Sequence, residues 1–172
     1  ILIASPHPDD AFFSLGASIL DAKKHKLLIW DIFNVQEYTL LNEDKESARI
    51  RIIEEERTAT RITNSELRLE DLPEAGLRGY RRLGQMLKCK WSKKDLSVEE
   101  KSIYNKVCKA FIKVLLEWKP DWVGIPLGCG GHIDHIIVRE AVLNKMKCID
   151  PEFVPRIFLY EELPYALNRQ WV

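Results

Sequence analysis

The chain has 172 residues, of which 46% are hydrophobic and 30% are charged, as in globular proteins large enough to bury a core. Its 26 Lys and Arg residues balance its 26 Asp and Glu residues, which argues against a nucleic-acid partner or an anionic membrane surface. No apolar run approaches the roughly 18 residues of a membrane-spanning helix, and no signal peptide is visible.

Cysteine usage indicates the cellular compartment. The four cysteines show no C-x-x-C spacing, which favours reduced thiols rather than a disulfide framework. These residues are Cys89, Cys108, Cys129 and Cys148. We therefore expect a cytoplasmic protein without membrane insertion.

The first predicted elements enclose a polar cluster. The apolar run ILIA (1–4) predicts a buried strand, and FFSLGASILDAKK (12–24) has apolar residues at helical intervals. Between them lies the tetrapeptide His7-Pro8-Asp9-Asp10. Asp9 or Asp10 is expected at the helix N-cap, where a carboxylate accepts backbone N–H groups. Taken alone, the tetrapeptide is explained equally well as a capped turn.

Strands and helices continue to alternate along the chain. We predict further strands at 27–33, 67–69, 121–128 and 156–160. We predict further helices at 42–62, 97–120 and 135–147, with a loop at 70–84. This alternation predicts an α/β fold, in which a mostly parallel sheet carries helices on both faces. We expect residues 1–172 to form a single domain, and we expect residues to precede Ile1 because the chain starts within a strand.

A second polar cluster follows the strand at 121–128. It reads Gly130-Gly131-His132-Ile133-Asp134-His135, and taken alone it is simply a polar helix start. Ligands of open parallel sheets bind beyond the carboxyl ends of the strands. If the two strands that precede these clusters are neighbours, both clusters share one crevice.

The combined residue types favour a metal site. Three His and three Asp side chains in one crevice are costly unless something satisfies them, and His nitrogen and Asp oxygen both suit zinc. Three protein ligands leave a position for water, whose pKa zinc lowers to about 7. A spare carboxylate then suits a general base, and a spare His suits oxyanion stabilisation or protonation of a leaving amine. The same residue types accept Fe²⁺ or Mn²⁺.

The motifs SPHPDDA and GGHIDH together resemble the two signatures of the PIG-L/LmbE-like family of zinc-dependent N-deacetylases. LRGY (77–80) and YEELPYA (160–166) are similar to stretches of one bacterial branch of that family. The resemblance implies a Rossmann-like three-layer sandwich and deacetylation of N-acetylglucosamine-type groups.

Carried over by position, the resemblance implies a role for each polar residue. It implies Asp9 as the general base that activates a zinc-bound water. It implies that His132 steadies the oxyanion or protonates the departing amine, and that Asp134 holds His132 in place. The implied zinc ligands are His7, Asp10 and His135.

Two departures from the family pattern stand out. Ala11 occupies the position where the motif most often has Glu, which removes support around the metal but none of the implied ligands. The chain also ends soon after LPYA, whereas such proteins often continue. We therefore expect a C-terminal segment that shapes the substrate pocket to be absent.

Candidate substrate-binding residues lie between the motifs. Arg78 and Tyr80 suit a sugar hydroxyl or phosphate, since the Arg fork matches oxyanions; the alternative is a surface loop with an anchoring Tyr. The charged stretch EEERTATR (54–61) is ordinarily a solvated helix face, although Arg49 or Arg51 lies close enough in sequence to reach the crevice.

The main functional prediction is a metal-dependent hydrolase that removes acetyl from a small N-acetylated sugar or amino-sugar conjugate. One alternative is a zinc hydrolase of another amide or an ester, because the pocket rather than the metal selects the substrate. The other is a catalytically weak member that only binds a sugar or a metal. The sequence leaves the oligomeric state open.

Overall fold

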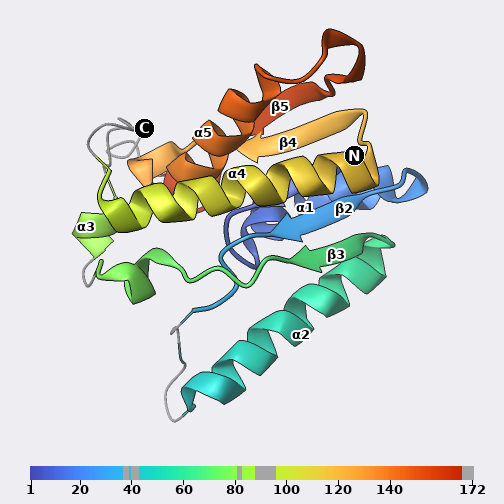
Figure 1. Cartoon of the computed structure of the whole chain (residues 1–172). Coiled ribbons are helices and arrows are strands. Elements are labelled where there is room, and N and C mark those ends of the chain that lie inside the picture. The colour runs from blue at the N-terminus through green and yellow to red at the C-terminus, as the bar shows by residue number, and fades with distance from the viewer. Residues whose placement is uncertain (37–38, 40–42, 81–82, 88–95, 168–172) are drawn as a thin grey trace.

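Strands and helices alternate in the computed structural model, which describes residues 1–36, 39, 43–80, 83–87 and 96–167 (Figure 1). The strands are β1 (Leu2–Ser5), β2 (Leu28–Asp31), β3 (Glu66–Leu69), β4 (Trp122–Pro126) and β5 (Arg156–Tyr160). The helices are α1 (Asp10–Asp21), α2 (Lys45–Thr63), α3 (Leu83–Met86), α4 (Val98–Trp118) and α5 (Ile133–Met146). The predicted strands and long helices therefore occur in the predicted order.

The strands form one parallel sheet in the order β3-β2-β1-β4-β5. The chain moves outward from β1 to β3 and then starts the other half of the sheet at β4. This reversal places β1 directly beside β4, with Leu2 opposite Val123. Ligand sites in such sheets form at this switch point. The predicted α/β fold is confirmed, and the condition for a shared crevice, that these two strands are neighbours, is met.

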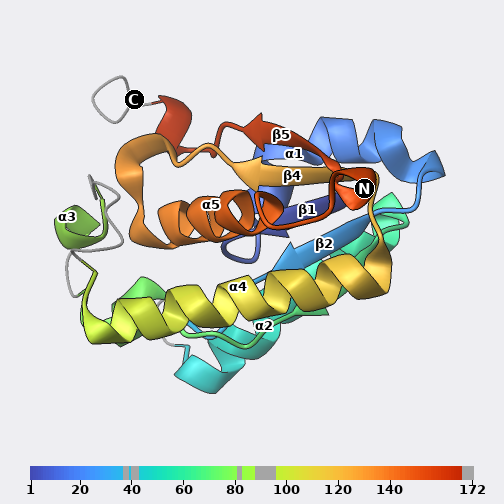
Figure 2. The ribbon, with the colours of Figure 1, turned by 45° about the horizontal axis from the view of Figure 1, so that its top comes forward.

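Helices cover both faces of the sheet because successive strand residues point to opposite sides. Ala4 and Trp30 pack beneath α4 and α5 in the larger hydrophobic cluster. Ile3 and Ile29 pack against Ile19 of α1 in a smaller cluster on the other face. Figure 2 shows α4 and α5 on one side of the sheet and α1 on the opposite side. The result is the predicted three-layer arrangement.

The helix that follows β1 begins differently from the prediction. Asp9 occupies the N-cap of α1 as expected, but its side chain caps no backbone N–H group, and its φ is 91°. The Asp10 carboxylate instead accepts the N–H of His7 at 3.0 Å. The capping prediction is therefore wrong in its hydrogen bonds, because the N–H group that Asp10 accepts belongs to His7, outside the helix.

Two further segments differ in detail. α5 begins at Ile133 rather than 135, which places His135 in its first turn. The predicted loop at 70–84 contains a 3-10 turn, Ala75–Arg78, and the start of α3. This turn approaches the first residues of α5, because the Ala75 N–H donates to Asp134 at 2.9 Å.

The sequence predicts no membrane-spanning helix and reduced cysteines. Among the described residues, each helix is too short or too polar to cross a membrane. Cys108, Cys129 and Cys148 carry free thiols, and Cys89 lies outside the described residues.

Candidate metal and catalytic centre

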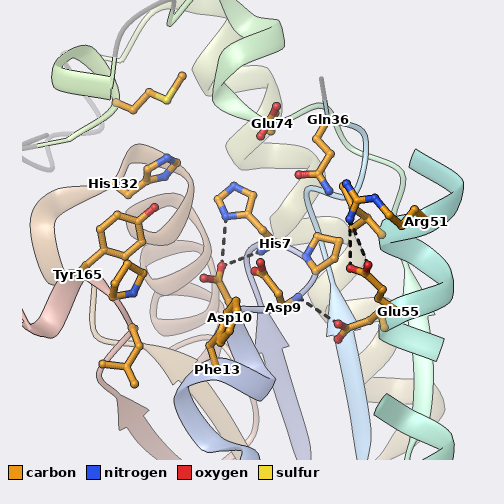
Figure 3. Close-up of a pocket in the computed structure, with 16 residues that line it drawn as sticks. His7, Asp9, Asp10, Phe13, Gln36, Arg51, Glu55, Glu74, His132 and Tyr165 are labelled. Atoms are coloured by element: carbon orange, nitrogen blue, oxygen red, sulfur yellow. Dashed lines mark hydrogen bonds and ion pairs between the residues drawn. The ribbon is translucent and has the colours of Figure 1, made fainter. Parts of the chain in front are cut away.

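The loops after β1 and β4 bring three histidines together. The ring centroids of His7, His132 and His135 lie 5.0 to 5.3 Å from one another. One nitrogen of each ring lies within 4.8 Å of a nitrogen of the other two. Figure 3 shows His7, Asp9, Asp10 and His132 around a single cavity. The two motifs thus share one crevice, as predicted.

Asp10 lies between two of these histidines. Its Oδ2 is 3.2 Å from Nδ1 of His7 and 3.2 Å from Nε2 of His135. The contact with His135 lacks hydrogen-bond geometry, so this buried Nε2 has no hydrogen-bond partner among the described residues. Buried polar atoms without a partner are uncommon and require an explanation. Two nitrogens and one oxygen that converge in this way fit a bound divalent cation.

The outer nitrogen of each of these two rings contacts a buried carboxylate. Nε2 of His7 lies 3.0 Å from Oδ2 of Asp134, and Nδ1 of His135 lies 2.9 Å from Oε1 of Glu162. Carboxylates in this position fix the ring orientation and tautomer of metal-binding histidines. The arrangement leaves Nδ1 of His7 and Nε2 of His135 facing the shared centre.

Sequence reasoning did not find Glu162. This fully buried residue also accepts the backbone N–H groups of Gly128 at 2.7 Å and Cys129 at 3.2 Å. It therefore connects the end of β5 to the loop after β4. Two signals in the sequence pointed to it: it lies two residues after the last predicted strand, at the edge where ligands bind, and it belongs to the stretch YEELPYA.

The charges of this cluster favour a cation at its centre. Burial lowers the pKa of His135, but the carboxylates of Asp10 and Glu162 outweigh burial and raise the pKa to about 9. Burial likewise opposes the charged form of His7, yet Asp10 and Asp134 raise its pKa well above the usual range. A divalent cation supplies the same positive charge while both imidazoles are neutral ligands.

Asp134 has a different partner from the one implied by the resemblance. Its carboxylate contacts His7, the N–H of Ala75 and the guanidinium of Arg78. Its link to His132 is through its backbone N–H, which donates to Nδ1 at 3.3 Å. Asp134 therefore orients His7 with its side chain and His132 only with its main chain.

Arg78 is likewise placed differently from the expectation. Its guanidinium is buried between Asp134 and Glu100, and it donates to the carbonyl of Pro73 at 2.7 Å. Arg78 and Tyr80 are both absent from the described lining of the cavity, and Tyr80 packs against the larger hydrophobic cluster. Arg78 therefore anchors Asp134 rather than facing a ligand, because its guanidinium is already paired with two buried carboxylates.

His132 is a neutral side chain in this environment. Burial and the nearby rings of His135 and His7 lower its pKa to about 3. Because Nδ1 accepts the Asp134 N–H, the ring proton belongs on Nε2. His132 lines the cavity and can therefore donate a hydrogen bond through Nε2.

Asp9 presents an accessible carboxylate in the cavity. Partial burial and the neighbouring Asp10 raise its pKa to about 7, although His7 and His135 act in the opposite direction. Its backbone N–H donates to Glu56 of α2 at 3.1 Å. A carboxylate that titrates near neutrality in a polar cavity is suited to proton transfer.

The cavity above these residues has a volume of about 510 Å³, within the range of small-molecule sites. Phe13, Gln36, Arg51 and Tyr165 form part of its wall (Figure 3). Arg51 thus reaches the crevice, where it pairs with Glu43 and Glu55. A second cavity, of about 800 Å³, lies around Trp122, at the opposite end of β4 from both motifs.

Ala11, the departure from the family motif, does not face this cavity. It is fully buried and packs with the smaller hydrophobic cluster. Its N–H donates to the hydroxyl of Ser5 at 3.2 Å. In this chain the position therefore contributes packing beneath the centre and no polar group.

A family model and a curated relative each match most of this chain. The family described as "PIG-L: GlcNAc-PI de-N-acetylase" matches residues 2–146. The 2′-N-acetylparomamine deacetylase of Streptomyces fradiae is 30% identical over 181 residues, covering 99% of this chain and 59% of the relative. The chain thus spans less than two thirds of that curated relative.

Solved deacetylase structures share the fold. The zinc-inhibited form of teicoplanin deacetylase Orf2 superposes with a TM-score of 0.74 at 21% identity, covering 99% of this chain and 70% of that one. The A40926 pseudoaglycone deacetylase Dbv21 gives a TM-score of 0.68 at 23% identity, with coverages of 96% and 64%. The N,N′-diacetylchitobiose deacetylase of Pyrococcus horikoshii gives 0.54 at 15% identity, with coverages of 85% and 48%.

Proposed function

Because the chain belongs to the PIG-L (GlcNAc-PI de-N-acetylase) family, we propose that it hydrolyses the acetamido group of an N-acetylated amino-sugar conjugate. The observation that carries this proposal is the junction of Asp9, His132 and the His7–Asp10–His135 centre at one cavity. The deacetylase activities named for 2′-N-acetylparomamine and for teicoplanin belong to relatives. They support the substrate class for this chain.

We propose His7, Asp10 and His135 as ligands of a divalent metal, with zinc as the first choice and Fe²⁺ or Mn²⁺ as the other candidates. The unpartnered Nε2 of His135 and the shared position of Asp10 support this set. His132 is the competing third ligand, because its ring also lies within reach of the other two. A metal held there supplies a Lewis acid and a water of lowered pKa.

Asp9 is the proposed general base. Its carboxylate takes a proton from the water that attacks the amide carbonyl. As the C–N bond breaks, the same carboxyl group returns a proton to the departing amine, so that acetate and the free amino sugar result. The accessible position of Asp9 on the cavity surface supports both transfers, since a base must reach the proton that it moves.

His132 is the proposed oxyanion donor. Its Nδ1 already accepts a backbone hydrogen bond, which leaves the Nε2 proton for the oxygen that becomes negative as water adds. A fixed donor of this kind stabilises the transition state by up to about 4 kcal/mol. The proton for the amine then comes from Asp9, because the single ring proton of a neutral His132 stays in the hydrogen bond to the oxyanion.

The test is an acetate-release assay on a panel of N-acetylated amino sugars and aminoglycosides, extended to other amides and to esters. The protein is stripped of metal and reloaded with Zn²⁺, Fe²⁺ or Mn²⁺ at one equivalent and in excess, because a zinc-inhibited form is known for a relative. We expect Asp9→Asn to lower kcat by at least about 100-fold. The control is Asp21→Asn, at an exposed carboxylate. Full activity of Asp9→Asn, or hydrolysis of esters alone, would contradict the proposal.

A further inference from the structure

Glu56 is a buried carboxylate in a helix that the sequence predicts to be solvent-facing. Only 3% of the residue is exposed, and it lines the cavity from α2. One oxygen, Oε2, accepts the N–H of Asp9 at 3.1 Å. The other oxygen, Oε1, has no hydrogen-bond partner among the described residues. Buried carboxylates are rarely left in this state without a role.

The backbone of Asp9 explains why this contact matters. Its φ of 91° lies in the left-handed region, which residues with a side chain seldom adopt and which the surrounding structure must hold in place. The Asp9 carbonyl accepts the N–H of Phe13 at 2.8 Å, the first hydrogen bond of α1. The Asp9 N–H is held only by Glu56 among the contacts described. These two bonds fix the peptide groups on both sides of the Asp9 Cα.

We propose that Glu56 is a positioning residue for Asp9: it holds the backbone N–H of Asp9 and thereby aims the Asp9 carboxylate into the cavity. This inference rests on the proposed role of Asp9 as general base. The contact joins α2 to the loop after β1 across 47 residues, so the direction of the base depends on the packing of a second helix. The role requires an acceptor oxygen at this point, and it does not require a negative charge.

This requirement separates two variants of similar volume. Glu56→Gln keeps an oxygen that can accept the Asp9 N–H, whereas Glu56→Met fills the same space without an acceptor. We expect Glu56→Gln to retain at least about half of wild-type kcat. We expect Glu56→Met to lose about 10- to 100-fold in kcat with KM nearly unchanged, because small displacements of a reacting group cost rates of this order. Glu54→Met, at an exposed position of the same helix, is the matched control.

A double-mutant cycle with Asp9→Asn shows whether Glu56 acts through Asp9. If it does, Glu56→Met causes little further loss of the residual rate in the Asp9→Asn background. Amide hydrogen exchange supplies a readout that is independent of turnover. We expect the Asp9 N–H to exchange slowly in the wild type and in Glu56→Gln, and faster in Glu56→Met. Metal content and the unfolding midpoint are measured for every variant.

Several outcomes would overturn the inference. Glu56→Met that keeps its kcat, or that loses the same factor with and without Asp9, removes the positioning role. Glu56→Gln that is as slow as Glu56→Met assigns the effect to charge instead. If Asp9→Asn itself is fully active, the proposed function of Asp9 fails together with the inference. If Asp9→Asn is inactive while Glu56→Met is active, only the inference fails.

Discussion

The carboxylate of Asp134 lies 3.0 Å from Nε2 of His7, although 127 residues separate them in the chain. The same carboxylate is held by Arg78, which in turn pairs with Glu100 of α4. A buried chain of charged groups thus runs from α4 to the loop after β1. These charged groups fix the orientation of His7, although α4 itself contributes no residue to the described lining of the cavity.

Asp134→Asn is expected to weaken metal binding by about 10- to 100-fold, as with other carboxylates that orient a metal-binding His. The carboxylate now accepts hydrogen bonds from Ala75 and Arg78 and contacts His7. In the variant the Asn amide nitrogen, itself a donor, would face at least one of these groups. Competition with a chromogenic chelator measures the affinity, and Asp21→Asn is the control. Unchanged affinity would show that His7 is oriented without Asp134.

Arg78→Met is expected to destabilise the fold rather than to raise KM. Removal of the guanidinium breaks the buried pair with Glu100 and leaves Asp134 with only His7 and the Ala75 N–H, and broken buried pairs cost about 3–5 kcal/mol. Urea unfolding measures the loss, with Arg61→Met at an exposed position as control. A stable variant with a large increase in KM would restore Arg78 as a substrate-binding residue.

His135→Ala and His132→Ala distinguish the two possible ligand sets. We expect His135→Ala to lose its bound metal and its activity, because Nε2 of His135 lies at the shared centre. We expect His132→Ala to keep the metal and to lose about 100- to 1,000-fold in kcat as an oxyanion donor. Elemental analysis of each variant, purified without chelator, measures its metal content. Loss of metal from both variants would make His132 a ligand.

Asp31→Asn is expected to stabilise the protein increasingly as the pH rises. Burial and the nearby Glu56 raise the pKa of Asp31 well above its usual range, and its two oxygens have no hydrogen-bond partner among the described residues. The folded state therefore binds this proton more tightly than the unfolded state does. Wild-type stability is then lost, by up to about 1.4 kcal/mol per pH unit, as the pH rises from about 4 toward the raised pKa.

The measurement is the difference in unfolding free energy between wild type and Asp31→Asn at pH 5 and at pH 7.5, at equal metal loading. The difference should be larger at pH 7.5, because Asn carries no charge at either pH. A variant that is equally destabilised at both pH values would show that the Asp31 carboxyl group makes a favourable contact when it is ionised.

The sequence by itself determined the order of the elements and the two polar motifs. Short apolar runs marked the strands, and apolar residues at helical spacing marked helices such as α1 and α4 within a few residues. Both kinds of pattern arise from local backbone geometry and the burial of one face. The position of the motifs after two strands predicted a shared crevice on the condition that the strands are neighbours, because parallel strands end at one edge of a sheet.

Only the tertiary structure decided which carboxylate serves which histidine. Asp134 contacts His7 rather than holding His132 with its side chain, and Arg78 is buried behind it. Glu162, which follows β5, contacts His135, and Glu56 of α2 contacts the backbone of Asp9. In the sequence Glu56 stands among charged residues, but in α2 it shares its buried face with Ile53, Thr60 and Thr63. These contacts depend on how the crossover connections stack the helices on the sheet, and that packing has no local sequence pattern.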